Sequence, residues 1–457
     1  MIFASPLFIF VFLPVVWVSY MFAPPRWRNS VLLVASSLFY ISGAGWYALL
    51  LLGLIVATIV IAPYTVHHRG ILGVGVVLNL MPLLWYKYAG FLAHVGQNLI
   101  GVTTDQSPSI LLPLGISFYT FHAISYLVDV AYQRVEPDRQ GWSYALYILL
   151  FPHLIAGPIV RFKDIRSQFA DPYRTINAHN ISSGLQTFCI GFSKKILIGD
   201  HCALIADRVF ADPGSYGSSG VWIGVLAYTL QIYFDFSGYS DMAVGLARIF
   251  GYRFPRNFRR PYVAQSITEF WRRWHISLSR WFRDYVYIPL GGNRHGRWRT
   301  YFNLWVIFFL CGLWHGANYT FVVWGIGHGI WMVLERMRWW RPRGWWGQVS
   351  TLLIVMALWV PFRATDISST LHLWQAMVGW EMNAYVSSTL LLLEPKNLFI
   401  LGIGVLITTM PQRWFQRGTV FLARRPLLQS GAILSLFLLA LMTLIDSGFT
   451  PFIYANF

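Results

Sequence analysis

The sequence has few charged residues, and acidic residues are especially scarce. Only 12% of its 457 residues are charged, and 18 aspartates and glutamates stand against 35 lysines and arginines. With 56% hydrophobic residues and a mean hydropathy of +0.51, the chain has too little polar surface for a soluble globule of this length. The composition therefore predicts an all-α polytopic membrane protein.

Other absences narrow the class of protein further. The three cysteines, Cys189, Cys202 and Cys311, form no CxxC pair and lie in or near apolar segments, so the sequence indicates neither a disulfide framework nor a zinc site. No Gly-x-Ser-x-Gly elbow occurs, so the serine-hydrolase signature is missing. The N-terminus has no basic region before its first apolar run and no small-residue cleavage site after it, so we expect the first helix to be retained. We expect no bound metal or cofactor and no nucleic-acid partner.

Apolar runs that suit a hydrocarbon core of ~30 Å recur from end to end. Several are short or interrupted by glycine and proline, so we predict about a dozen spans or half-spans, including re-entrant helices. Arg26 and Arg28 follow the first run, and the positive-inside rule places that loop in the cytoplasm. The runs are Leu7 to Phe22, Val31 to Gly43, Tyr47 to Ala62, Ile71 to Tyr86, Ile110 to Val130, Trp142 to Ala156, Ile181 to Ile198, Val221 to Phe236, Phe302 to Leu310, Phe321 to Leu334, Leu352 to Phe362, Leu398 to Thr408 and Ala432 to Leu444.

Residues 248–299 form a strongly basic segment. It contains twelve arginines against only Glu269 and Asp284, which predicts a cytoplasmic location. Two interpretations remain open and do not exclude each other. The segment sets topology and touches anionic lipid, or it also receives an anionic acyl donor, either a CoA nucleotide or an acidic carrier protein.

His315 lies in Cys311-Gly-Leu-Trp-His-Gly-Ala-Asn318, between two apolar stretches. An ionisable side chain within the membrane marks a functional site by default, and histidine suits proton transfer near neutral pH. We therefore interpret His315 as a catalytic candidate, with a structural hydrogen bond between helices as the alternative. Gly312 and Gly316 should let a neighbouring helix approach this backbone. His328 is expected to serve interhelical structure.

A helix is expected to begin at Ser266, because Ser266-Ile-Thr-Glu269 has the spacing of a capping box. Trp271, Trp274, His275 and Leu278 begin one continuous apolar face that extends to Tyr285. The pattern predicts a single amphipathic helix at the membrane surface, with its apolar face in the bilayer. From this pattern alone, His275 is as readily structural as reactive.

A second polar cluster lies within an otherwise apolar run. Asp235, Ser237, Tyr239 and Asp241 surround Gly238, which we expect to break the helix, and lipid cannot face these groups. They line a cavity or lock one helix to another, and we favour the structural role. Proline and glycine around His122 and His153 indicate broken helices at a pocket, and both histidines are weaker candidates.

Long linked motifs then resemble one known family, the membrane-bound O-acyltransferases, and within it the alginate O-acetylase group. The resemblance is carried by Tyr233-Phe-Asp-Phe-Ser-Gly-Tyr-Ser-Asp-Met-Ala243, by Ile267-Thr-Glu-Phe-Trp-Arg-Arg-Trp-His-Ile-Ser-Leu-Ser279, by Trp281-Phe-Arg-Asp-Tyr285 and by Gly312-Leu-Trp-His-Gly-Ala-Asn318. It extends more loosely over the whole chain. Relatives that transfer D-alanine to teichoic acids share much of this core, so D-alanyl or other acyl transfer to a cell-wall polymer is the alternative activity.

The resemblance implies specific roles. His315 corresponds to the essential catalytic histidine and His275 to a second important one. Independently of the resemblance, we expect Trp314 and Asn318 to support them or line the pocket. The resemblance also implies one acyltransferase domain, 1–457, with a catalytic core at about 228–335, and tilted helices around a central funnel in the bacterial inner membrane. The donor, acetyl-CoA or an acylated carrier, enters from the cytoplasm, where Arg272, Arg273 and Arg280 are candidates to bind it. The acetyl group leaves outward to a polysaccharide through a periplasmic SGNH-type acetyltransferase partner.

Two chemical roles for His315 remain open at this stage. A neutral imidazole accepts the hydroxyl proton as a general base or takes the acyl group transiently as a nucleophile. Asn318 or His275 is the expected hydrogen-bond donor to the anionic tetrahedral species. A transporter of polysaccharide or lipid-linked sugar is the non-enzymatic alternative, since broken helices and buried carboxylates also fit that role.

Overall fold

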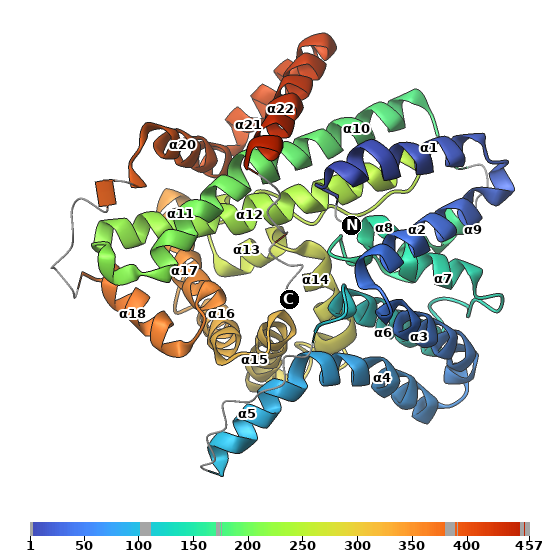
Figure 1. Cartoon of the computed structure of the whole chain (residues 1–457). Coiled ribbons are helices and arrows are strands. Elements are labelled where there is room, and N and C mark those ends of the chain that lie inside the picture. The colour runs from blue at the N-terminus through green and yellow to red at the C-terminus, as the bar shows by residue number, and fades with distance from the viewer. Residues whose placement is uncertain are drawn as a thin grey trace. The chain divides into compact units, whose positions relative to one another are not determined.

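The computed structural model describes residues 3–100, 111–170, 174, 176–379, 389–390, 392–447 and 452. All regular secondary structure in these residues is helical, and no strand occurs among them (Figure 1). The predicted all-α class is therefore confirmed. The described residues divide into two compact units, one within Met1–Phe188 and Ser240–Pro255, the other within Cys189–Tyr239 and Arg256–Ile453.

The first unit contains the N-terminal helices. Two of them are interrupted by wider π-helical turns, η1 and η4. The helices are η1 (Phe8–Phe12), α1 (Leu13–Phe22), η2 (Pro25–Trp27), α2 (Arg28–Ala44), α3 (Tyr47–Ile61), η3 (Ala62–Val66), α4 (Arg69–Leu83), η4 (Leu84–Tyr88), α5 (Ala89–Leu99), α6 (Ile116–Ala131), α7 (Trp142–Leu149), α8 (Phe151–Leu154), α9 (Phe162–Ala170) and most of α10 (Ala178–Ser193).

The second unit contains the histidines that the sequence singled out. α12 begins in this unit and ends in the first one. The helices are η5 (Lys194–Gly199), α11 (Asp200–Ala211), η6 (Pro213–Ser215), α12 (Ser218–Ile249), η7 (Pro261–Val263), α13 (Ile267–Arg273), α14 (Ile276–Phe282), η8 (Arg283–Tyr287), α15 (Gly296–His315), α16 (Tyr319–Met337), α17 (Gly344–Arg363), α18 (Ile367–Met377), α20 (Pro395–Thr409), α21 (Gln412–Ala423) and α22 (Pro426–Ser447).

Four helical segments among the described residues are long and apolar enough to cross a membrane. They are Tyr47–Val66, Arg69–Gln97, Gly344–Arg363 and Pro426–Asp446. A fifth is counted if α20 and α21, which meet at a bend of 99°, form one broken span. Several apolar helices are thus present, while the full number of about a dozen spans remains a prediction.

Side-chain caps explain several helix starts. Ser266 Oγ accepts the backbone N–H of Glu269, Asn318 Oδ1 accepts that of Thr320, and Asp366 Oδ1 accepts that of Ser369. Glu269 completes the predicted capping box in a shifted form, because its carboxylate accepts the N–H of Gln265 rather than that of Ser266. The predicted helix start at Ser266 is confirmed.

The predicted helix break at Gly238 is wrong. α12 runs without interruption from Ser218 to Ile249. A Cβ placed on Gly238 would lie only 2.6 Å from the carbonyl oxygen of Gly191 and 3.1 Å from the backbone nitrogen of Lys195. Glycine is therefore needed at this position for close approach of two helices, and its conformational freedom is not used.

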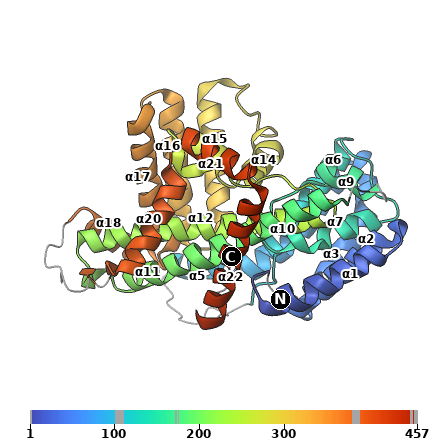
Figure 2. The same cartoon turned by 90° about the horizontal axis from the view of Figure 1, so that it is seen from above.

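α15, α16 and α17 pack side by side within the second unit (Figure 2). Large aromatic residues fill the space beside them, and Trp274, Trp324 and Trp359 are fully buried. The indoles of Trp274 and Trp324 lie 5.0 and 6.0 Å from that of Trp359, measured between ring centroids. This aromatic core holds the helix ends that carry the candidate site.

Candidate active site

His315 is the last residue of α15, and its side chain is almost fully buried, with 2% of the residue exposed. Its imidazole contacts three aromatic rings edge-on: Trp314 at 4.8 Å, Trp324 at 5.0 Å and Phe362 at 5.1 Å between centroids. These rings come from α15, α16 and α17. The site therefore combines a titratable nitrogen with walls that exclude water, which strengthens electrostatic interactions inside it.

Two glycines bring α15 and α16 together beside His315. A Cβ on Gly312 would collide with the carbonyl oxygen of Phe321 and lie 3.3 Å from the Cα of Gly325. A Cβ on Gly316 would collide with the ring of Phe321. The prediction that Gly312 and Gly316 allow close helix approach is confirmed.

This packing gives a direct test of how strictly the imidazole is positioned. We expect Gly312→Ala to force the two backbones apart, destabilise the protein by about 1–3 kcal/mol and lower activity by up to ~10²-fold, because His315 lies one turn away. Gly402→Ala in α20 is the matched control, since a Cβ there meets nothing within 4 Å. Thermal unfolding and acyl transfer should be measured on both variants, and equal activity in the two would contradict this positioning role.

His275 lies in a break between helices. α13 ends at Arg273, Trp274 is extended, and His275 adopts the left-handed conformation at φ 40° before α14 begins. The predicted single amphipathic helix is therefore wrong. Its apolar face is also not turned to lipid, because Trp271 and Trp274 pack against His328 and Trp359 at 5.1 and 5.0 Å.

The hydrogen bonds of His275 show which ring nitrogen carries a proton, and its burial sets its charge. Its Nδ1 lies 3.2 Å from Asn257 Oδ1, an atom that also accepts the N–H and the hydroxyl of Ser277. Because those bonds fix the amide orientation, Nδ1 carries the proton and Nε2 keeps its lone pair. Burial lowers the pKa of His275 to about 3, so this fully buried imidazole is neutral at physiological pH.

The two candidate histidines meet at one indole. The ring of Trp314 lies 4.8 Å from the imidazole of His315 and 6.1 Å from that of His275. Phe236, on α12, closes the other side of His275 at 4.7 Å. The structure thus brings His275, Trp314 and His315 into one aromatic-walled site within the second unit.

Asn318 is occupied in a structural role. Its amide nitrogen donates to the carbonyl oxygen of Thr365 at 2.8 Å, and its Oδ1 caps the first turn of α16. The hydrogen bonds of Asn318 and His275 therefore do not favour either side chain as donor to an anionic intermediate. His275 Nε2 is instead an acceptor.

The polar residues of α12, Asp235, Ser237, Tyr239 and Asp241, differ in their contacts and burial. Asp235 lies 3.3 Å from Lys195 Nζ, which also bonds Asp200 at 2.6 Å, and the lysine side chain is fully buried. Ser237 is buried, Asp241 is half-buried, and Tyr239 stacks on Phe452 at 4.4 Å. Asp235 thus joins two helices, as the favoured structural interpretation required, with a lysine as its partner.

The candidate donor-binding arginines differ in their contacts. Arg272 and Arg280 are exposed, whereas Arg273 is paired with Glu269 at 2.6 Å. Arg272 borders an apolar pocket of about 340 Å³ that reaches Phe308 and Cys311. Cys311 precedes His315 by one turn on the same face of α15, so this pocket approaches the site along α15.

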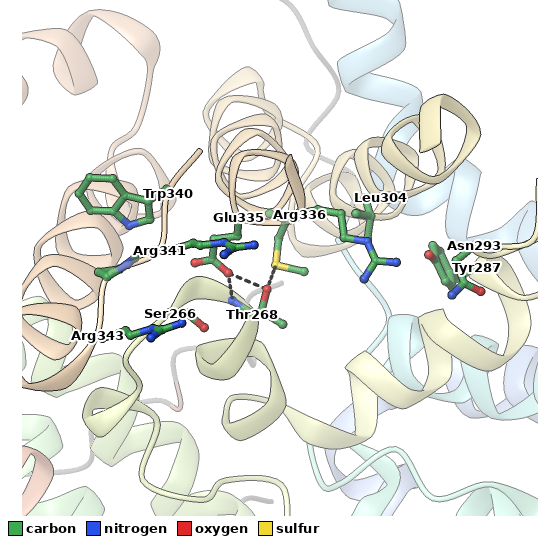
Figure 3. Close-up of a pocket in the computed structure, with 12 residues that line it drawn as sticks. Ser266, Thr268, Tyr287, Asn293, Leu304, Glu335, Arg336, Trp340, Arg341 and Arg343 are labelled. Carbon is green, nitrogen blue, oxygen red and sulfur yellow. Dashed lines mark hydrogen bonds between the residues drawn. The ribbon is translucent and has the colours of Figure 1, made fainter. Parts of the chain in front are cut away.

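A second pocket, of about 550 Å³, continues from the first and shares Thr268, Tyr287, Leu304 and Met332 with it. Figure 3 shows Trp340, Arg341 and Arg343 at one end of this pocket. Arg336 also lines it, while Glu335 is used to cap α13 by accepting the backbone N–H and hydroxyl of Thr268 at 2.9 and 2.6 Å.

Three other histidines that the sequence singled out are fully buried. His328 Nδ1 accepts the indole N–H of Trp271 at 3.2 Å, which gives the interhelical contact that was predicted. In the first unit, His122 and His153 are fully buried and lie 4.8 Å apart. Among the described residues, no three or more of His, Cys, Asp and Glu are grouped so that they could hold a metal ion.

Sequence reasoning missed several residues that build the site. Lys195 interrupts the apolar run from Ile181 to Ile198, so an intramembrane cation was a readable signal. Asn257, Phe362 and the arginines after Glu335 gave no local signal, because their roles depend on residues distant in sequence.

The geometry first defines a class of protein: a helical membrane protein with a buried, aromatic-walled histidine site next to a pocket lined with arginine. Comparison with known proteins then gives the family. Residues 138–342 match the model of the MBOAT, membrane-bound O-acyltransferase family. The whole chain aligns with the full length of a probable alginate O-acetylase AlgI of Azotobacter vinelandii at 39% identity.

Two further relatives agree. The probable alginate O-acetylase AlgI of Pseudomonas aeruginosa is 41% identical over 89% of this chain and 79% of its own length. The peptidoglycan O-acetyltransferase of Helicobacter pylori is 36% identical over 83% of this chain and 80% of its own length. The chain belongs to the membrane-bound O-acyltransferase family, and it is a membrane-embedded acyltransferase.

Proposed function

We propose that this chain moves an acetyl group from a cytoplasmic donor across the bacterial inner membrane for O-acetylation of an exopolysaccharide. The observation that carries the proposal is the pair of buried histidines, His275 and His315, around Trp314, in a chain whose relatives are named alginate O-acetylase and peptidoglycan O-acetyltransferase. The direct test is mass spectrometry of the extracellular polysaccharide from cells with and without this chain. Unchanged O-acetyl content would overturn the proposal.

The chemical step needs a base in a dry site. The oxygen of an acceptor hydroxyl attacks the acetyl carbonyl carbon of the thioester donor. The new C–O bond forms and the C–S bond of the thioester breaks. His315 takes the hydroxyl proton and returns it to the departing thiolate, which leaves as a thiol; such catalysis typically supplies ~10²–10⁴-fold. Acyl transfer through His315 as a transient carrier uses the same geometry. His275, with Nε2 unprotonated, would act as a second proton acceptor.

The two connected pockets fit an acyl donor with a charged end and an apolar arm. Arg336, Arg341 and Arg343 would hold the anionic end, and Trp340 offers an aromatic face. The apolar pocket would take the arm toward Cys311, one turn from His315. The donor is acetyl-CoA or an acylated carrier, and no bound cofactor is needed. Tilted helices around a central funnel, within one domain of 1–457, would complete the path across the membrane.

Salt dependence should reveal whether the exposed arginines act on the donor. We expect Arg272→Gln with Arg280→Gln to weaken donor binding by up to ~5-fold per charge, with the larger effect at low salt where charges are unscreened. Arg273→Gln is the matched control, because that charge is already paired with Glu269. Donor affinity should be measured by titration at two salt concentrations. If the double variant binds the donor as tightly as wild type at both salt concentrations, Arg272 and Arg280 do not bind the donor and serve only as a topology signal.

A partner is needed because a polymer is too bulky to enter a pocket between packed helices. We propose that a periplasmic SGNH-type acetyltransferase receives the acetyl group and delivers it to the sugar hydroxyl. We expect the purified chain, in liposomes with donor and polymer, to acetylate the polymer inefficiently until such a partner is added. Efficient polymer acetylation by the chain alone would rule the partner out.

A further inference from the structure

A basic pocket of about 640 Å³ lies in the first unit, separate in sequence from the histidine site. It is formed by the end of α9, the start of α10, and the last turn of α12 with the residues that follow it. Arg174, Arg248, Arg253 and His179 line it, and none of its described lining residues is acidic. The acyl-transfer chemistry described above uses none of these side chains.

Arg174 is fixed in place before any ligand arrives. Only 5% of the residue is exposed. Its guanidinium donates to the hydroxyl of Tyr20 at 3.0 Å, to Asn29 Oδ1 at 2.8 Å and to the carbonyl oxygen of Gln168 at 2.7 Å. It also lies 4.3 Å above the ring of Tyr252. A cation held in this way loses little freedom on binding an anion.

The two other arginines, Arg248 and Arg253, are held by uncharged partners. Arg248 donates to the hydroxyl of Ser183 at 3.2 Å. The backbone of Arg253 is held by the side chain of Gln168, which accepts its N–H at 2.7 Å. None of the ion pairs found among the described residues uses Arg248 or Arg253. Their charges are therefore available to a ligand.

The start of α10 adds to this positive field. His179 and Asn180 lie in its first turn and line the pocket. Asn177 caps the helix by accepting the N–H of Asn180 at 2.7 Å. The N-terminal end of a helix carries a partial positive charge, which favours an anion near it.

The surroundings of Arg174 place the pocket relative to the membrane. Tyr20 is in the last turn of α1 and Asn29 in the first turn of α2. The short connection between them includes Arg26, and Arg28 is the first residue of α2. Arginines in a short loop after an apolar helix indicate the cytoplasmic side. By this rule we expect the pocket on the cytoplasmic side of the membrane, near the phospholipid headgroups.

We propose that this pocket binds a phosphate group. Planar guanidiniums match phosphate oxygens bidentately, and those of Arg248 and Arg253 with a helix start can balance a dianion. The phosphate belongs either to an anionic phospholipid headgroup or to a soluble phosphate compound. The inference does not depend on the acyl-transfer chemistry. It gives Arg248 and Arg253, two of the twelve arginines in the basic segment, a specific ligand.

The test compares two variants of the full-length protein with equal loss of charge. Arg248→Gln/Arg253→Gln removes the two available cations and leaves Arg174 to support the packing. Arg294→Gln/Arg297→Gln removes two exposed arginines elsewhere in the basic segment. Native mass spectrometry in detergent measures binding of phosphatidylglycerol against phosphatidylcholine, and thermal-shift titration measures binding of inorganic phosphate and pyrophosphate.

We expect the pocket variant to lose at least tenfold in affinity and the control variant to bind as wild type. Selective binding of phosphatidylglycerol identifies the ligand as a lipid headgroup, and selective binding of the inorganic probes identifies a soluble phosphate. Each of these outcomes supports the proposal if the pocket variant loses the binding. The proposal is overturned if wild type binds neither kind of probe, if the pocket variant binds as wild type, or if both variants lose affinity equally.

Discussion

His315→Ala is expected to leave the protein inserted in the membrane at normal levels and to abolish O-acetylation of the polysaccharide. The imidazole is the titratable group at the centre of an aromatic-walled site, and removing a general base typically costs ~10²–10⁴-fold in rate. The change removes a side chain at the last position of α15, so it should disturb the helix little. Acetyl content should be measured by mass spectrometry of the glycan, with protein level measured on the same membranes.

His328→Asn is the matched control for this experiment. His328 is also fully buried, and asparagine retains an acceptor for the indole N–H of Trp271. We expect lower thermal stability and acetylation within a few-fold of wild type. Acetylation above one tenth of wild type in His315→Ala would remove His315 from the catalytic role.

Lys195→Met is expected to give the largest loss of stability. The ammonium group of Lys195 bridges Asp200 and Asp235, and its side chain is fully buried. Removing one partner of a buried ion pair typically destabilises a protein by about 3–5 kcal/mol, because the remaining charge is left uncompensated. We therefore expect a large fall in the unfolding temperature of the purified protein, or poor accumulation in membranes.

A second substitution should relieve part of this loss. In Lys195→Met with Asp235→Asn, one of the two uncompensated carboxylates is removed, so the double variant should be more stable than the sum of the two single changes predicts. Strict additivity across the four proteins would show that Lys195 and Asp235 are not coupled. Asp235 is followed in sequence by Phe236, whose ring contacts His275. A loss of stability in the Lys195 variants with acetylation unchanged would show that the ion pair acts on the fold and not on His275.

The sequence predicted those parts of the site that depend on neighbours along the chain. The Trp-His-Gly motif and its small residues led to His315 and to the close approach of α15 and α16. The capping box led to the start of α13. Each of these signals is local, because it concerns residues within one or two helical turns.

The failures arose where distant residues decide the local conformation. The apolar period continues smoothly through Trp274 and His275, yet the chain breaks there. Asn257 supplies the reason, since its carbonyl oxygen accepts the N–H of Ile276 at 2.9 Å and its side chain binds His275 and Ser277. Eighteen residues separate Asn257 from His275 in sequence, so no periodicity analysis could detect this contact.

The role of Gly238 also depends on residues that are distant in sequence. A glycine in a helical pattern indicates either a break or a close approach, and sequence alone does not distinguish them. In the structure Gly238 allows close approach, because the backbone of Gly191 and Lys195 packs directly against it. The ion pair of Lys195 with Asp235 was within reach of sequence reasoning, since both charges interrupt apolar runs.

The most direct measurement of the central claim follows labelled acetyl groups in liposomes that contain the purified chain and its periplasmic partner. Labelled donor is supplied only on the face that carries the basic segment, and acceptor polysaccharide only on the other. We predict that label reaches the acceptor with wild-type protein and stays on the donor with His315→Ala. Transfer by His315→Ala at the wild-type rate would contradict the account.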